Sequence, residues 1–278
     1  MASKQAPVCV RMKGWPIIVA GGASGIGAGT VARLHSEGAI VQIFDINGEG
    51  AKEVADKYAS DVSYQVVDVT NKKMCAQAVE KFANANGGMV QGLVNSVAYF
   101  GCKAFDAEKE DWDKSFSVNV VGYANMVTAV QPYMLEARKL KLSCSIVNVS
   151  STSRSIAQVK RWTYNATKGA VSAMTRCMAL DMGRDNIRVN AISPSWTWTP
   201  EVAKAAKEGG REKWEPVWGK FHMLNRIGNV EEVASAIAFL LSDDAGFVTG
   251  SDLACDGGYM AIGPERFGED SSFAGSDY

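Results

Sequence analysis

The chain has 278 residues, of which 47% are hydrophobic, and its 29 Lys and Arg nearly balance its 30 Asp and Glu. This length suffices for one large α/β domain, and the net charge of −1 excludes the global basic field of proteins that bind nucleic acid or anionic membranes. Six scattered cysteines without C-x-x-C spacing and only two histidines, His35 and His222, argue against a metal site, a disulfide framework and Ser-His-Asp catalysis. No apolar run reaches 18 residues, so we expect no membrane span and a cytoplasmic protein.

The first strong signal is a glycine-rich turn between a strand and a helix. Residues 16–20 form an apolar, β-branched run that predicts a buried strand, and the sequence GGASGIG follows at 21–27, before a helical pattern that runs through Glu37. Such a turn points free backbone N–H groups and a helix dipole at a phosphate, and glycine lets the backbone approach it closely. A tight turn with no ligand is the alternative.

An acidic residue ends the second predicted strand. Residues 39–44 read as a strand, and Asp45 follows directly. A carboxylate about 20 residues after the glycine turn can accept hydrogen bonds from an adenosine ribose, and its charge would repel a 2′-phosphate. Because no Arg or Lys follows immediately, we favour NAD over NADP; the alternative is a turn or helix-capping Asp.

The rest of the chain alternates strands with helices, which predicts a parallel, doubly wound sheet whose ligand lies beyond the carboxyl ends of the strands. Asp45, Asp68 and Asn95 each stand at such an end. In a helical stretch over 108–141, Asn119 is a polar residue among valines, and Pro132 predicts a kink or break. We expect strands at 62–67, 91–95, 145–149, 187–192 and 250–256, helices at 49–59, 71–86, 162–183 and 229–241, and a helical flap within 200–225. Asn229 and Glu232 have the spacing of a capping pair at the start of the last of these helices.

Tyr164 and Lys168 are four residues apart in a predicted helix, so they share one face. A nearby ammonium favours the phenolate, and a phenol with a lowered pKa can exchange a proton with an alcohol or a carbonyl. The alternative is an accidental pairing on a helix surface. The serines and threonine at 150–153 precede this helix; they are typical of a turn, but a hydroxyl there could face the same cleft.

As a set, these residues resemble the short-chain dehydrogenase/reductase family in its single-domain form, over about residues 14–260. The resemblance implies a Rossmann-like sheet of about seven parallel strands, NAD(P)-dependent interconversion of alcohols and carbonyls, and a homotetramer or homodimer with helices near 113–140 and 162–183 at the interface. The motifs that carry it, in family order, are Gly21-x-x-x-Gly25-Ile26-Gly27, Asn95, Asn119, Ser151, Tyr164-x-x-x-Lys168, Arg188-Val189-Asn190-Ala191-Ile192 and Asp256-Gly257-Gly258.

The resemblance also implies a role for each matching residue. Tyr164 would be the general acid and base, and Lys168 would lower its pKa and hold the nicotinamide ribose. Ser151 would bind the substrate oxygen, and Asn119 would support a water-linked proton path. The cofactor-binding residues that we expect are Gly21, Ser24, Gly25, Ile26, Gly27, Asp45, Asp68, Val69, Asn95, Tyr164, Lys168, Pro194, Thr197 and Thr199.

Three departures from the family pattern lie near the expected cofactor. Ala20 replaces the usual Thr before the first glycine, and Ser195 replaces the usual Gly after Pro194. The segment Asn95-Ser96-Val97-Ala98 replaces the usual Asn-Asn-Ala-Gly, and the added bulk of Val97 and Ala98 predicts a reshaped surface under the cofactor. None of these changes removes the proton-transfer group.

Tryptophans at 162, 196, 198, 214 and 218 gather near the Tyr and in the flap. Indoles give large apolar contacts, so we expect a bulky aromatic or alicyclic substrate, bound by Ser151, Tyr164 and Trp196; flap packing or a subunit interface is the alternative. A sugar or polyol dehydrogenase and a non-catalytic nucleotide-binding regulator are the competing functions. We divide the chain into an arm at 1–14, one domain at 15–262 with its flap at about 196–225, and a tail at 263–278.

Overall fold

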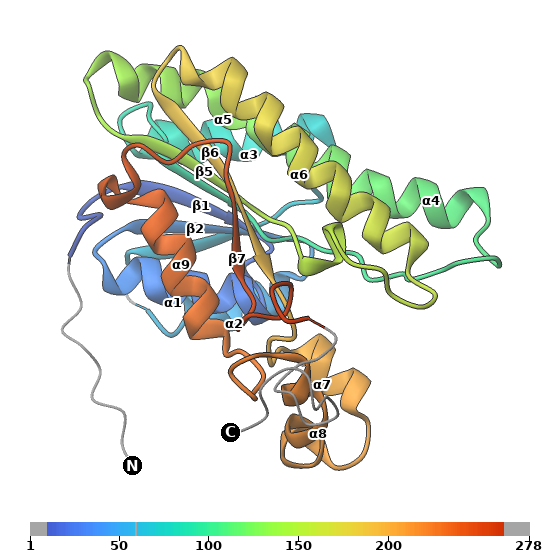
Figure 1. Cartoon of the computed structure of the whole chain (residues 1–278). Helices are drawn as coiled ribbons and strands as arrows, with labels where there is room; N and C mark the ends of the chain where they lie inside the picture. Colours follow the sequence, from blue (N-terminus) through green and yellow to red (C-terminus); the bar gives the residue numbers. More distant parts are fainter. Residues whose placement is uncertain (1–9, 59, 264–278) are drawn as a thin grey trace.

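The computed structural model describes residues 10–58 and 60–263 (Figure 1). The predicted arm before residue 10 and the predicted tail from residue 264 therefore lie outside the described residues. The described end of the arm is packed onto the domain: Met12 is buried, and Arg11 Nη2 donates to Glu37 Oε1 at 2.6 Å.

One seven-stranded sheet forms the centre of the molecule, and all of its neighbouring strands are parallel. The strand order is β3-β2-β1-β4-β5-β6-β7, so the direction of winding reverses between β1 and β4. Ligands of such sheets bind at this reversal, beyond the carboxyl ends of the strands. The predicted doubly wound parallel sheet is confirmed. Its strands are β1 Pro16–Ala20, β2 Ile40–Asp45, β3 Val62–Val66, β4 Gly92–Asn95, β5 Cys144–Val149, β6 Ile187–Pro194 and β7 Asp252–Cys255.

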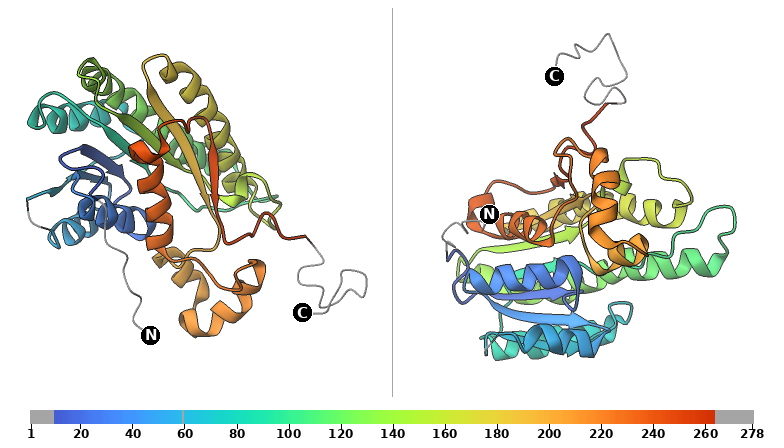
Figure 2. Two further views of the ribbon diagram at one scale, coloured as in Figure 1. Left: turned by 60° about the vertical axis from the view of Figure 1, so that its left-hand side comes forward. Right: turned by 90° about the horizontal axis from the view of Figure 1, so that it is seen from below.

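Helices cover both faces of the sheet and bury its apolar strands, as parallel sheets require (Figures 1 and 2). One hydrophobic cluster lies under α1, α2 and α9, and a second lies under α3, α5 and α6. The bounds are α1 Gly25–Ser36, α2 Gly48–Ala55, α3 Lys72–Ala85, α4 Lys109–Phe116, α5 Gly122–Lys139, α6 Trp162–Gly183 and α9 Val230–Leu241, with short 3₁₀ turns η2 Thr152–Arg154 and η4 Asp243–Ala245. Among the residues that the structure describes, no helix is long and apolar enough to cross a membrane.

The long helical stretch is irregular at Asn119 rather than at Pro132. Residues Ser117–Val121 form the π-helical turn η1 between α4 and α5, whereas α5 continues through Pro132 to Lys139. A break at Pro132 is therefore wrong, because α5 packs against α3 and the sheet, and this tertiary support holds the helix across one lost N–H donor; the alternative of a kink stays a prediction. π-helical turns are rare in proteins and are frequently found at functional sites.

The predicted flap residues form two short helices and a 3₁₀ turn next to the carboxyl ends of the strands (Figures 1 and 2). These are α7 Pro200–Ala206, α8 Gly210–Trp218 and η3 Gly219–Phe221. Trp218 stacks between two other indoles, with ring centroids 4.8 Å from Trp196 and 4.9 Å from Trp214. Helix α9 then begins with a capping box between Asn229 and Glu232, as the sequence predicts.

Candidate active site

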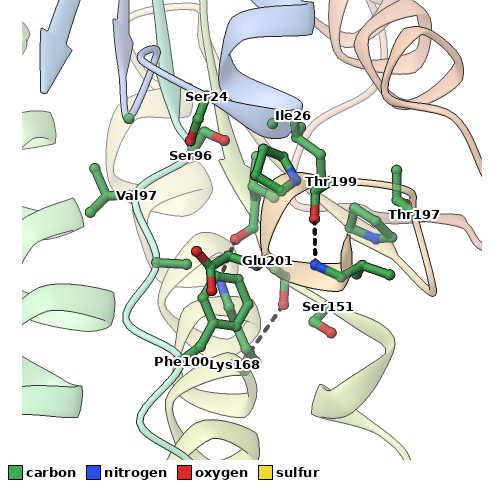
Figure 3. Close-up of a pocket in the computed structure, with 18 of the residues that line it drawn as sticks. Ser24, Ile26, Ser96, Val97, Phe100, Ser151, Lys168, Thr197, Thr199 and Glu201 are labelled. Atoms are coloured by element: carbon green, nitrogen blue, oxygen red, sulfur yellow. Dashed lines mark hydrogen bonds between the residues drawn. The ribbon is translucent and has the colours of Figure 1, made fainter. Parts of the chain in front are cut away.

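A cleft of about 320 Å³ lies at the carboxyl edge of the sheet (Figure 3). Its walls come from the glycine turn after β1, the segments that follow β4, β5 and β6, and the first turn of α7. Figure 3 shows Ser24 and Ile26 toward α1, away from Ser151 and Lys168. The cleft therefore spans the sheet from the glycine turn to the helix that carries the Tyr–Lys pair.

The glycine turn is built so that only glycine fits at two positions. Gly21 has a φ of 85°, and a Cβ there would lie 2.6 Å from Val97 N. A Cβ on Gly27 would lie 1.9 Å from Gly21 O. Helix α1 starts at Gly25 with no acidic residue in its first turn and no side-chain cap from Ser24. Its first N–H groups and positive dipole end are thus available to a phosphate, which fits a bound dinucleotide.

The carboxylate of Asp45 is held beside this turn by two backbone donors. Its Oδ2 accepts from Ala23 N at 3.0 Å, and its Oδ1 accepts from Asn47 N at 2.9 Å. Asp45 also lines the cleft. It therefore combines the two interpretations left open by the sequence: it supports the local turn and presents a negative charge to the cleft.

The Tyr–Lys pair lies on α6 and is buried. Tyr164 is 6% exposed and Lys168 is 1% exposed, and both line the cleft. Lys168 Nζ lies 5.7 Å from the centroid of the Tyr164 ring and donates to Val149 O at 2.8 Å. The helical spacing thus brings the two groups to one site, as predicted.

Burial acts on both members of the pair. It raises the pKa of Tyr164 to about 12, although a hydrogen bond with Ser151 and the charge of Arg161 act in the opposite direction. Burial also lowers the pKa of Lys168 to about 7. The direction for Tyr164 is opposite to the lowered pKa expected from the spacing, because desolvation disfavours the phenolate more than the neighbouring groups favour it.

Two serines of the hydroxyl cluster after β5, Ser150 and Ser151, line the cleft. Ser151 Oγ donates to Ser153 Oγ at 3.0 Å and accepts from Ser153 N at 3.1 Å, and Ser151 lines the cleft. Ser150 Oγ instead donates to Lys168 O at 3.1 Å, which joins the end of β5 to α6. Ser151 therefore both stabilises the local turn and lines the cleft.

Some expected site residues lie outside the cleft lining, and their predicted roles stay predictions. Asn95 is buried and donates to Asn148 Oδ1 at 2.9 Å, and Val69 is buried in the core. Asp68 accepts from Thr70 N at 2.9 Å. Asn119 Oδ1 accepts from Tyr99 N at 2.7 Å, so Asn119 holds the segment after β4 that lines the cleft. The expected residues that do line it are Gly21, Ser24, Gly25, Ile26, Asp45, Ser151, Tyr164, Lys168, Pro194, Thr197 and Thr199.

Two lining residues carried no signal in the sequence. Phe100 stacks on Tyr164, with ring centroids 5.3 Å apart, and Glu201 enters from the start of α7. Both lie in irregular or short segments, where the periodicity of hydrophobic residues does not predict which way a side chain points. The unusual Ser195 also lines the cleft, and its Oγ lies 2.8 Å from His222 Nε2, which ties the end of β6 to the segment after α8.

A second cavity, of about 430 Å³, adjoins the cleft. Ser151, Tyr164 and Phe100 line both spaces. Trp196, which we expected to contact the substrate, lines the second cavity but not the cleft, and its predicted role stays a prediction. Tyr164 therefore stands where the cleft and the second cavity meet.

The parallel sheet, the glycine turn at its winding reversal and the serine beside a Tyr–Lys pair define an oxidoreductase of the nucleotide-binding type. Residues 21–260 match a family model described as enoyl-(acyl carrier protein) reductase. The chain belongs to the short-chain dehydrogenase/reductase family.

Similar proteins cover nearly the whole chain. The 3-oxoacyl-(acyl-carrier-protein) reductase FabG of Thermotoga maritima is 33% identical over 255 residues, which are 90% of this chain and 100% of that protein. The cyclopentanol dehydrogenase of Comamonas testosteroni is 35% identical over 251 residues, 88% of this chain and 96% of the other. The ligand-free structure of Thermoplasma acidophilum aldohexose dehydrogenase has a TM-score of 0.82 at 32% identity, and covers 91% of this chain and 96% of that one.

Proposed function

We propose that this protein is an NAD-dependent dehydrogenase that interconverts a secondary alcohol and its ketone, with a bulky alicyclic or aromatic substrate. The observation that carries the proposal is the position of Tyr164, which lines both the cleft and the adjoining cavity together with Ser151. A substrate oxygen at this junction would meet both hydroxyl groups, while its carbon skeleton occupies the second cavity.

The nicotinamide cofactor would supply the hydride acceptor or donor. The residues of the chain would handle the proton and the substrate oxygen. Ser151 would hydrogen-bond that oxygen, and Tyr164 would take the hydroxyl proton in oxidation or return it in reduction. Lys168 has one donor committed to Val149 O. Its remaining donor capacity is available to a cofactor ribose.

Asp45 supports the choice of NAD. Its carboxylate oxygens accept from Ala23 N and Asn47 N, so the charge is held at the end of β2. A 2′-phosphate near this carboxylate would be repelled, whereas ribose hydroxyl groups can donate to it.

The walls of the second cavity support a bulky cyclic substrate. Phe100, Trp196 and Val202 supply its apolar surface. Similarity to a cyclopentanol dehydrogenase favours a cyclic alcohol. Similarity to an aldohexose dehydrogenase keeps a sugar as the second candidate, since aldohexoses are also cyclic and indoles also contact sugar faces.

The test is NADH or NADPH formation with cyclopentanol, cyclohexanol, D-glucose and ribitol, each with NAD and with NADP. We expect cyclic alcohols to be oxidised with NAD, with kcat/KM at least about 100-fold above that with NADP, and Asp45→Ser to reduce this ratio at least about 10-fold. Preference for glucose would replace the substrate class, and preference for NADP would refute the Asp45 argument. Tight NAD binding without turnover of any alcohol would favour the non-catalytic regulator.

A further inference from the structure

The second cavity contains one positive charge that no acidic side chain neutralises. Its charged lining residues are Arg161, Glu201 and Lys204. Lys204 Nζ lies 2.5 Å from Glu201 Oε1, so these two charges form a pair. Within residues 10–58 and 60–263, the Arg161 guanidinium has neither an ion-pair partner nor a side-chain hydrogen bond. The cavity therefore carries a net positive charge from Arg161.

Arg161 is close to the reaction centre by its place on the helix. It is the N-cap residue of α6, three positions before Tyr164, and both residues line the second cavity. Its positive charge acts on the Tyr164 phenol and opposes the rise in its pKa. A group bound to Arg161 would therefore lie within the span of a small molecule whose hydroxyl reaches Tyr164.

Gln158 supplies further hydrogen-bond donors to the same cavity. Its Oε1 accepts from Ser153 Oγ at 2.7 Å, and Ser153 Oγ in turn accepts from Ser151 Oγ at 3.0 Å. This chain commits the amide oxygen of Gln158 to the protein, so its NH₂ group is the part left for a ligand. Within the described part of the chain, that NH₂ group has no hydrogen-bond partner.

We infer that the substrate carries a carboxylate, bound by Arg161 and Gln158, in addition to the hydroxyl or ketone that reaches Ser151 and Tyr164. This inference rests on the proposed function and narrows its substrate class to an alicyclic or aromatic hydroxy acid or keto acid. The planar guanidinium can bind a carboxylate through two parallel hydrogen bonds, and the Gln158 amide can add a third. Phe100 and Trp196 would contact the ring between the two polar ends.

The first arm of the test compares two substrates that differ only in charge: 3-hydroxycyclohexanecarboxylate and 3-hydroxycyclohexanecarboxamide. We expect the wild type to prefer the carboxylate at least about 10-fold in kcat/KM, mainly through KM, because a charge-assisted bidentate contact exceeds a neutral one by that much. Arg161→Gln should abolish this preference, which is scored as the ratio of kcat/KM for the two substrates at one pH, because loss of the Arg161 charge also acts on the phenol of Tyr164. The matched control is Arg184→Gln, which removes the same charge at the exposed far end of α6 and should keep the preference.

The second arm does not depend on turnover. Binding of cyclohexanecarboxylate and of cyclohexanecarboxamide, neither of which has a hydroxyl to oxidise, is measured by calorimetry on the NAD-loaded protein. We expect the carboxylate to bind at least about 10-fold more tightly, and Arg161→Gln to remove the difference.

The two arms separate failure of the inference from failure of the proposed function. If cyclohexanol is oxidised but the carboxylates gain nothing over the carboxamides, the carboxylate site is refuted and the dehydrogenase stands. If no alcohol is oxidised but the carboxylate still binds through Arg161, the anion site stands and the reaction is wrong. Equal losses for charged and neutral ligands in Arg161→Gln would also refute the site, because they indicate a structural role.

Discussion

The central chemical feature at the scale of residues is a phenol and an amine buried together. Burial raises the pKa of Tyr164 to about 12 and lowers that of Lys168 to about 7, so both groups favour their neutral forms in the protein alone. A neutral phenol is the form that donates a proton to a ketone, whereas alcohol oxidation needs the phenolate. The two directions of the reaction should therefore respond to pH in opposite ways.

The first prediction concerns this pH dependence. Because the pKa of Tyr164 is raised, the phenolate fraction grows with pH, and kcat/KM for oxidation of a neutral cyclic alcohol should rise between about pH 7 and pH 10. The reduction should slow over the same range. Arg161→Gln should move both profiles to higher pH, since the charge of Arg161 lowers the pKa of the phenol, and Arg184→Gln is the control. A profile for oxidation that falls across this range would contradict the assignment.

The second prediction concerns the stability cost of Lys168. Its amino group has an ordinary pKa of 10.5 and a folded-state pKa of about 7, so between these values the unfolded chain binds a proton that the folded chain releases. The cost of burying the Lys168 ammonium lowers the free energy of unfolding most below about pH 7, and this cost shrinks as the pH rises toward 10. Lys168→Met should therefore raise the free energy of unfolding at pH 7 by about 1–2 kcal/mol and abolish turnover.

Urea unfolding of the cofactor-free protein at several pH values checks this expectation. The gain in Lys168→Met should decrease from pH 7 to pH 9. A variant that is less stable than the wild type at pH 7 would show that the bond from Lys168 Nζ to Val149 O outweighs the desolvation of the amine.

At the scale of elements, the π turn η1 supports the wall of the cleft. It carries Asn119, whose Oδ1 accepts from Tyr99 N at 2.7 Å and whose Nδ2 donates to Tyr99 O at 3.0 Å and to Thr167 Oγ1 at 3.1 Å. Residues 96–100 have no regular secondary structure, and Ser96, Val97, Ala98 and Phe100 line the cleft. One buried amide thus joins an irregular lining segment to α6.

The third prediction is that Asn119→Ala lowers the free energy of unfolding by about 2–3 kcal/mol, because it leaves the backbone N–H and C=O of Tyr99 without these partners. It should also weaken NAD binding, since the lining segment loses its support. Asn119→Asp would place a carboxylate at a fully buried position against the carbonyl of Tyr99, so it should be at least as destabilising as Asn119→Ala. Unchanged unfolding and NAD affinity in Asn119→Ala would contradict this role.

Sequence patterns predicted the regular elements better than their interruptions. Alternating apolar strands and amphipathic helices were enough to predict the parallel sheet, and the pair at Asn229 and Glu232 predicted the start of α9. Pro132 was expected to break a helix that continues through it, because tertiary packing overrides local preference. The π turn at Ser117–Val121 left only one local trace, a polar Asn119 among valines.

At the scale of the whole molecule, the sheet topology explains why distant residues could be grouped from the sequence. The carboxyl ends of parallel strands meet at one edge, so Asp45 at the end of β2, Ser151 after β5 and Pro194 at the end of β6 reach one cleft. Phe100, Glu201 and Arg161 could not be grouped in this way. Their positions depend on irregular or short segments, whose direction no periodicity predicts.

The same topology fixes one side of the cleft at the ends of the strands, whereas an irregular segment and short helices form the other side. The proposed cofactor side of the cleft is formed by strand ends and the glycine turn, which the fold holds in place. The proposed substrate side is formed by the segment after β5 and by α7, together with Trp196 and the α8 residue Trp218 stacked on it. Assembly into a homotetramer or homodimer stays a prediction of the family resemblance, and analytical ultracentrifugation would measure it.

The most direct test of the central claim is the rate of NADH formation from cyclohexanol by Tyr164→Phe, measured beside the wild type under NAD saturation. If Tyr164 transfers the proton, removal of its hydroxyl should lower kcat by about 10²–10⁴-fold, with NAD affinity unchanged. A variant that binds NAD and retains kcat within about 3-fold of the wild type would contradict the account, because the proton would then pass through another group.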